Sequence, residues 1–214
     1  MQLTALFTST LLVSLTIAFP TTRQTAVTGS SKGFNLRVNL TDTTRDLTPS
    51  IQNQYLSTLR VGTGISISTL TPSAPAPPFY LNGTAYHTTI TFDVAPVYPL
   101  SLTVAGPSEY DALYPAEHPI GAAVNSGTEL FLRAGEPILF PLDQGGVYAI
   151  CQRDVVLGGQ KTSIPTARYV YGNETVPADC APVEFVVECA VLPDLPEDAS
   201  WTHDFAFDVP CERA

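Results

Sequence analysis

The dense spacing of prolines is the feature that most limits how this chain can fold. Nineteen prolines and fourteen glycines divide its 214 residues into short segments. A proline inside a helix removes a hydrogen bond and clashes with the preceding turn, so long helices are excluded. The segments are rich in Val, Ile, Thr, Tyr and Phe, which favour strands. The pattern predicts an all-β fold, a disulfide-bonded antiparallel β-sandwich with long loops and little helix.

Alternation of apolar and polar residues predicts where the strands lie. Residues 34–40 place Phe34, Leu36 and Val38 on one face, and residues 55–61 alternate in the same way. Two hairpins are expected, one joining residues 88–94 to 100–104 and the other joining 129–133 to 137–140. The remaining strands are expected at residues 146–151, 167–171, 183–191 and 201–209.

The first eighteen residues resemble a secretory signal peptide. An apolar run ends in Thr16-Ile17-Ala18, which puts the small residues Thr16 and Ala18 at the positions that a signal peptidase recognises, although no Lys or Arg precedes the run. A membrane anchor is disfavoured because a span needs about 20 apolar residues and this segment is shorter. We expect a signal peptide at residues 1–18, a disordered polar leader at 19–32, and a single β-sandwich domain at 33–214. The protein is then secreted and extracellular.

Four cysteines lie in the C-terminal third, namely Cys151, Cys180, Cys189 and Cys211. In an oxidising compartment this even number predicts two disulfides, and the close pairs of a zinc site are missing, so no metal or other cofactor is expected. Sequence alone allows three pairings. If residues 183–191 and 201–209 form a hairpin, Cys180 and Cys211 meet at its open end, which leaves Cys151 to pair with Cys189.

The charge and the glycosylation signals bear on the expected partners. The chain carries a formal net charge of −10 and has no basic cluster, which argues against nucleic acid and anionic membranes as partners. Sequons for N-glycosylation begin at Asn39, Asn82 and Asn173. We expect each modified asparagine to lie on the surface.

Several motifs together resemble a known family. These are Gly33-Phe34-Asn35-Leu36, Asp46-Leu47-Thr48-Pro49-Ser50, Phe79-Tyr80-Leu81-Asn82-Gly83-Thr84, Val176-Pro177-Ala178-Asp179-Cys180, residues 183–189 and the final Cys211. In this order they are similar to a family of secreted proteins of filamentous ascomycete fungi that is known as a domain of unknown function. The resemblance covers most of residues 33–214 and implies a secreted, mostly β protein. It implies no activity and no catalytic residue.

One segment concentrates side chains suited to binding. Residues 109–118 contain Glu109, Tyr110, Asp111, Tyr114, Glu117 and His118. Tyrosine rings stack on sugars and carboxylates accept hydroxyl hydrogen bonds, so these residues are the candidate ligand site, with glycans as the candidate ligand. The alternative is an exposed loop whose aromatic rings pack inward.

Catalytic motifs are absent from the sequence. It contains no Gly-x-Ser-x-Gly elbow, no His-Glu-x-x-His motif and no phosphate-binding loop. We therefore assign no catalytic residue and predict a non-catalytic extracellular protein that binds wall polysaccharide or a host surface. The alternative is a polysaccharide hydrolase with two carboxylates about 5 Å or 6.5–9.5 Å apart. The expected partners are extracellular glycans or a host protein.

Overall fold

The computed structural model describes residues 29–75, 77–84, 87–94, 98–109, 111–124, 127–132, 139–141 and 145–213. The strands are β1 (Gly29–Ser31), β2 (Gly33–Leu40), β3 (Tyr55–Gly62), β4 (Ile65–Thr71), β5 (Phe79–Thr84), β6 (His87–Val94), β7 (Tyr98–Val104), β8 (His118–Val124), β9 (Leu130–Leu132), β10 (Leu139–Pro141), β11 (Gly146–Leu157), β12 (Gln160–Tyr171), β13 (Cys180–Ala190), β14 (Ala206–Phe207) and β15 (Val209–Cys211). In these ranges the helical content is one 3-10 turn, η1 (Thr43–Arg45), and no helix is long and apolar enough to cross a membrane. The all-β prediction is confirmed.

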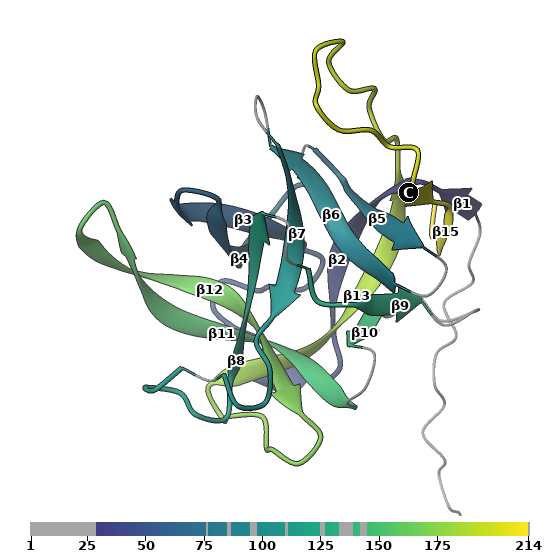
Figure 1. Ribbon diagram of the computed structural model, residues 1–214. Helices are drawn as coiled ribbons and strands as arrows, with labels where there is room; N and C mark the ends of the chain where they lie inside the picture. The colour runs from purple at the N-terminus through teal and green to yellow at the C-terminus, as the bar shows by residue number, and fades with distance from the viewer. Residues whose placement is uncertain are drawn as a thin grey trace, which may run out of the picture.

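The strands close on themselves as a barrel (Figure 1). Antiparallel pairing runs from β2 through β5, β6, β7, β8, β12, β11 and β13 and returns to β2. The β3–β4 hairpin pairs with β2 on one side and with β8 and β12 on the other. The predicted sandwich was therefore wrong in architecture, because the alternation that gives each strand an inner face does not tell whether the sheet closes.

The core lies inside the barrel, and β2 and β13 show how the sequence builds it. Phe34, Leu36 and Val38 are fully buried in one cluster, as the alternation predicted. Across the ladder, β13 adds Phe185 and Val187 to the same cluster. Because successive strand residues point to opposite faces, the polar residues between them face away from the core.

A long hairpin, β11–β12, extends from one side of the barrel (Figure 1). The two strands pair along their whole length, from Gly146↔Tyr171 to Leu157↔Gln160. Gly158 and Gly159 form the turn with φ of 56° and 83°, values that favour glycine. The sequence analysis expected only the inner halves of these strands. The hairpin predicted at residues 129–133 and 137–140 is confirmed as the antiparallel pair β9–β10.

The disulfides join Cys151 to Cys180 and Cys189 to Cys211. All four cysteines are paired as predicted, but the predicted partners, Cys180 with Cys211 and Cys151 with Cys189, were wrong. Cys151 and Cys180 lie directly opposite each other in the β11–β13 ladder, with their Cα atoms 4.3 Å apart. Direct opposition on neighbouring strands places the two side chains on the same face, where they can bond.

The predicted hairpin that motivated the wrong pairing does not form. After β13 the chain makes a long excursion over residues 191–205, visible at the top of Figure 1, and then returns beside the end of β13. Glu212 pairs with Glu188 in parallel, so Cys211 lies next to Cys189. A hairpin would have run antiparallel and carried Cys211 toward the other end of β13.

The N-terminal boundary also differs from the prediction. Gly29–Ser31, assigned to a disordered leader, form strand β1, which pairs with β15. The expectation of disorder was wrong for these residues because β15 supplies a partner strand from the far end of the chain. Residues 1–28, which include the predicted signal peptide and the rest of the leader, lie outside the described residues.

Candidate functional site

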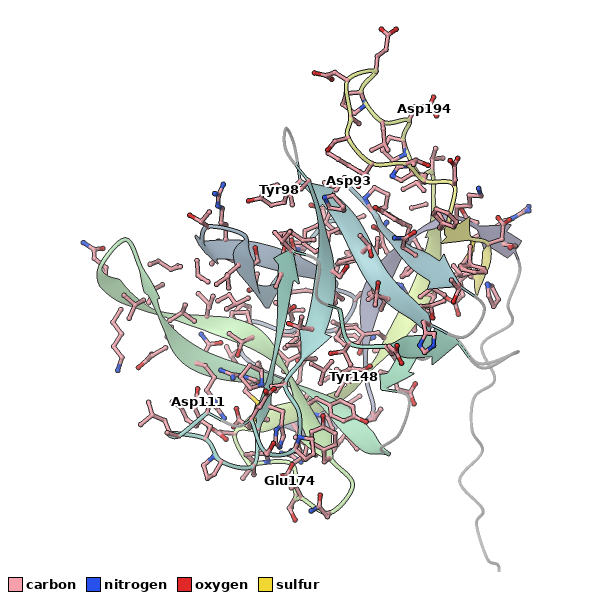
Figure 2. All side chains as sticks on the ribbon, viewed as in Figure 1. Asp93, Tyr98, Asp111, Tyr148, Glu174 and Asp194 are labelled. Atoms are coloured by element: carbon pink, nitrogen blue, oxygen red, sulfur yellow. A yellow bond between two sulfur atoms is a disulfide. The ribbon has the colours of Figure 1, made fainter. Side chains whose placement is uncertain are left out.

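Residues 109–118, the predicted glycan-binding loop, lie at the end of the molecule where Figure 2 labels Asp111 and Glu174. Glu109 is exposed, and its carboxylate accepts a hydrogen bond from the backbone N–H of Gly106 at 3.1 Å. Asp111 Oδ1 accepts a hydrogen bond from the N–H of Leu113 at 3.0 Å. Both acids therefore stabilise local turns. Tyr110 lies outside the described residues.

Glu117 is the centre of a buried ion network. Its side chain is 1% exposed, and Arg153 donates to both carboxylate oxygens, from Nε at 2.9 Å and from Nη2. Arg153 Nη1 also donates to Asp179 Oδ2 at 2.8 Å. Burial alone would lower the pKa of Arg153, but its hydrogen bonds to Glu117 and Asp179 outweigh burial and raise that pKa. Arg153 therefore keeps its positive charge inside the protein.

Two more groups enclose the same network. Arg168 Nε lies 3.7 Å from Glu117 Oε2, and burial lowers the pKa of Arg168, an effect that the charge of Glu117 opposes. The Tyr114 ring packs 4.1 Å from the guanidinium carbon of Arg153. The candidate Tyr114 is thus half-buried against a protein cation. This is the alternative arrangement that the sequence left open, aromatic packing inward.

His118 is fully buried and has partners at both ring nitrogens. Nδ1 lies 2.9 Å from the carbonyl oxygen of Gly106, and Nε2 lies 3.0 Å from a carboxylate oxygen of Glu174. The edge of Tyr171 packs on the ring, with centroids 4.6 Å apart. Glu117 and His118 therefore hold the loop against the barrel through buried hydrogen bonds. Neither side chain faces a solvent-filled cleft.

Among the described residues, one group of side chains with metal-ligand atoms close together is formed by Glu117, Cys151 and Cys180. The two sulfur atoms are bonded to each other, so neither is a free thiolate ligand. The group does not fit a metal centre.

The three sequons differ in exposure. Asn173 is exposed in the turn after β12. Asn39 is half-buried in β2 and its Oδ1 accepts a hydrogen bond from Gln52 at 3.3 Å. Asn82 is half-buried in β5, where its Oδ1 is enclosed. Because a glycan must project into solvent, Asn173 is the best placed of the three acceptors.

A cavity of about 380 Å³ opens at the opposite end of the barrel, near the labelled Asp93 and Tyr98 in Figure 2. The β3–β4 hairpin forms one wall, and β5, β6 and β7 form the other. The second wall is apolar, with the buried rings of Phe79 and Phe92 beside Leu100. We call this space the mouth cavity.

The mouth cavity exists because the β3–β4 wall presents small hydroxyl side chains to the interior. Thr58 lies opposite Ser68 in the ladder, on the face that carries the core residue Leu56. Ser66 lies two residues before Ser68, on the same face of β4, and lines the cavity. Ser66 and Ser68 are 5% and 0% exposed. Larger apolar side chains at these positions would fill the barrel to its rim, as they do deeper inside.

The polarity of β4 is therefore inverted at the mouth cavity. Its serines are buried, whereas Ile65 is 56% exposed. Ser68 Oγ has no hydrogen-bond partner among the described residues. Burying an unpaired hydroxyl costs about 1–3 kcal/mol. Packing gives no reason for this pattern, and such local violations are expected at functional sites.

Asp93, on the cavity wall, is held by three donors. Its Oδ1 accepts hydrogen bonds from the Tyr80 hydroxyl and from Trp201 Nε1, each at 3.0 Å, and its Oδ2 lies 2.9 Å from His203 Nε2. His203 packs against the Tyr80 ring at 4.7 Å between centroids. The excursion at residues 191–205 is therefore anchored beside the cavity through Asp93.

The comparisons with known proteins show the family. The profile of a family described as a domain of unknown function (DUF7907) matches residues 31–189. The chain belongs to this family. The DUF7907 match includes the β3–β4 wall and both rings of the apolar wall but ends before Trp201 and His203. The resemblance inferred from the motifs is thus confirmed.

A curated relative of this DUF7907 chain is "Antigenic protein SchS34" of Stachybotrys chartarum. The two are 30% identical over 201 residues, which cover 85% of this chain and 86% of the relative. No solved structure matches the chain.

Sequence reasoning missed the mouth cavity. The available signal was the alternation Ile65-Ser66-Ile67-Ser68, which taken alone predicts the isoleucines inside and the serines outside. In the structure Ser66 and Ser68 are buried, whereas Ile67 is half-buried and Ile65 is exposed at the rim of the cavity. Only the pairing of β4 with β3 and β8 determines which face turns inward.

Proposed function

We propose that this protein is a secreted, non-catalytic binding protein that holds a small amphipathic molecule in the mouth cavity. The observation that carries the proposal is the inverted polarity of β4. Buried Ser66 and half-buried Thr58 face an apolar wall across the cavity, so one side offers hydroxyl groups and the other offers aromatic and aliphatic surface. An apolar pocket with a few convergent polar groups is the usual form of a small-molecule site.

The size of the mouth cavity supports a small ligand. Its volume of about 380 Å³ lies near the lower end of the range of about 300–1,000 Å³ that ligand pockets occupy. Thr58 and Ser66 line the cavity, so their hydroxyl groups are placed to bond to a polar atom of the ligand. A polysaccharide chain is too bulky for this space.

The loop at residues 109–118 supports polysaccharide binding less well. Glu117 is bonded to Arg153, and His118 has partners at both nitrogens. The alternative of a hydrolase needs two free carboxylates facing a cleft, whereas the carboxylate of Glu117 is enclosed. The acids of this loop thus favour a structural role.

Two disulfides support an extracellular location, because such bonds persist in oxidising compartments. The signal-like residues 1–18 point the same way. A relative named for being antigenic also accords with a protein that leaves the cell.

The test uses the neutral fluorescent probe N-phenyl-1-naphthylamine and the oxidised chain. We expect saturable one-to-one binding, with a change in emission from Trp201, the single tryptophan, which is bonded to Asp93 on the cavity wall. Thr58→Leu fills the cavity and should weaken binding about tenfold or more. The matched control, Thr162→Leu, makes the same change at an exposed position of β12. Equal binding by both variants would contradict the proposal.

A further inference from the structure

We infer that the ligand of the mouth cavity is a monocarboxylate with a compact apolar body, and that Arg60 binds its carboxylate. This inference deepens the proposed function and rests on it. Arg60 lines the cavity at its rim, directly opposite Ser66 in the β3–β4 ladder. It therefore shares the face that carries the hydroxyl groups of Thr58 and Ser66.

Arg60 carries a charge that no acid of the described residues neutralises. Its Nε donates to the carbonyl oxygen of Gly62 at 3.2 Å, and both terminal nitrogens are without a hydrogen-bond partner among the described residues. Arg37 and Arg153, by contrast, each pair with two carboxylates. The chain has 20 acidic residues against 10 Lys and Arg, yet Arg60, at the rim of an apolar cavity, has no acidic partner among the described residues.

The nearby carboxylate does not compete for Arg60. Asp93 also lines the cavity, but both its oxygens are engaged by Tyr80, Trp201 and His203. Three donors spread its charge, so a second anion can enter the same space at lower electrostatic cost. Within the cavity, Asp93 thus has internal hydrogen-bond partners, whereas the terminal nitrogens of Arg60 are available to a ligand.

The rim offers a second donor for an anionic group. Tyr98 lines the cavity, and its hydroxyl lies 3.8 Å from the point where a Cβ on Gly64 would sit, so the ring reaches across to the β3–β4 turn. Its hydroxyl makes no hydrogen bond to another described residue. A carboxylate at the rim can therefore accept from the Arg60 fork and from Tyr98 while its apolar body lies against Phe79 and Phe92.

The experiment compares three ten-carbon probes on the full oxidised chain at pH 7. Decanoate, decanol and decylammonium share one apolar body and differ in the charge of the head group. Binding is followed by displacement of N-phenyl-1-naphthylamine. We expect decanoate to bind about tenfold more tightly than decanol, the order of one charge-assisted hydrogen-bonded contact, and decylammonium to bind most weakly.

Variants assign the preference to Arg60. Arg60→Gln should raise the Kd for decanoate about tenfold and leave that for decanol within about twofold, because the apolar wall is unchanged. The matched control, Lys32→Gln, removes one positive charge from an exposed residue outside the cavity lining and should change neither. Arg60→Lys keeps the positive charge but lacks the planar pair of N–H donors. Its Kd for decanoate should therefore lie between those of the wild type and Arg60→Gln.

The outcomes separate the inference from the proposed function. Equal binding of decanoate and decanol, or an unchanged preference in Arg60→Gln, would overturn the carboxylate inference while leaving a ligand-binding cavity. Tighter binding of decylammonium would overturn it as well. If neither decanol nor N-phenyl-1-naphthylamine binds, the proposed function fails, and the inference fails with it.

Discussion

Replacing Glu117 with Gln tests whether the buried ion network stabilises the fold. Glutamine keeps the shape of the side chain but removes its charge. In the native protein the Glu117 carboxylate, 1% exposed, receives two hydrogen bonds from Arg153 and lies 3.7 Å from Arg168. After the substitution the two guanidinium groups face each other across a neutral amide.

The magnitude follows from which partners remain. Arg153 keeps Asp179, whose side chain is 66% exposed and therefore screened by water, and Arg168 keeps a 3.9 Å approach to Asp111. Removing one partner of a buried ion pair costs about 3–5 kcal/mol because the other charge stays buried. We expect Glu117→Gln to lower the free energy of unfolding by that amount, a large fraction of the about 5–15 kcal/mol of a typical domain.

Asp179→Asn provides a matched control, because it removes the exposed acid of the same arginine. Because the Asp179 carboxylate lies largely in water, its pair with Arg153 is screened and should contribute about 1 kcal/mol or less, so this variant should stay near the wild type. Urea unfolding at pH 7 with disulfides intact measures both variants, and an unchanged m-value confirms that the compared states are the same. If Glu117→Gln costs no more than Asp179→Asn, the reasoning about the buried network is refuted.

Two further predictions concern acid and glycosylation. The hydrogen bond from Arg153 lowers the pKa of Asp179, and bonds from Ser50 and the backbone outweigh burial to lower that of Asp46. The stability these carboxylates add is present above their unfolded pKa of about 3.9 and lost as pH falls through the lower folded values, so urea midpoints should drop below about pH 4 and less steeply in Asp179→Asn. After expression in a glycosylating secretory host, Asn173→Gln should reduce the mass by one glycan, whereas Asn82→Gln should not; a loss confined to Asn82→Gln would contradict the exposure argument.

Much of the strand content could be predicted from the sequence, because alternation is a local property. Residues 34–40 and 183–191 matched β2 and β13 closely. The run at 201–209 was misassigned, since only Ala206–Phe207 and Val209–Cys211 find partner strands. Strands β4, β5 and β8 were missed. The small residues of β8 carry a weak local signal, whereas β4 and β5 contain residues that favour strands and were not assigned.

The candidate site was harder to predict. Residues 109–118 were predicted as the site because acids and aromatic rings cluster there, yet Glu117 and His118 have internal partners on β11 and in the turn after β12. Those partners, Arg153 and Glu174, are 36 and 56 residues away in the chain. The mouth cavity is built from residues of five strands, mostly hydroxyl and apolar with Arg60 and Asp93 among them, and none of these is distinctive alone.

The sequence by itself determined the all-β class, the participation of all four cysteines in disulfides and the family, because these depend on local propensity, composition and motif order. Only the tertiary structure decided barrel closure, the pairing of Cys189 with Cys211, and the inward turn of Ser66 and Ser68. The physical reason is that a strand's two faces are equivalent until its neighbours are chosen. Pairing between distant segments makes that choice, and with it decides which side chains line a core, an ion network or a cavity.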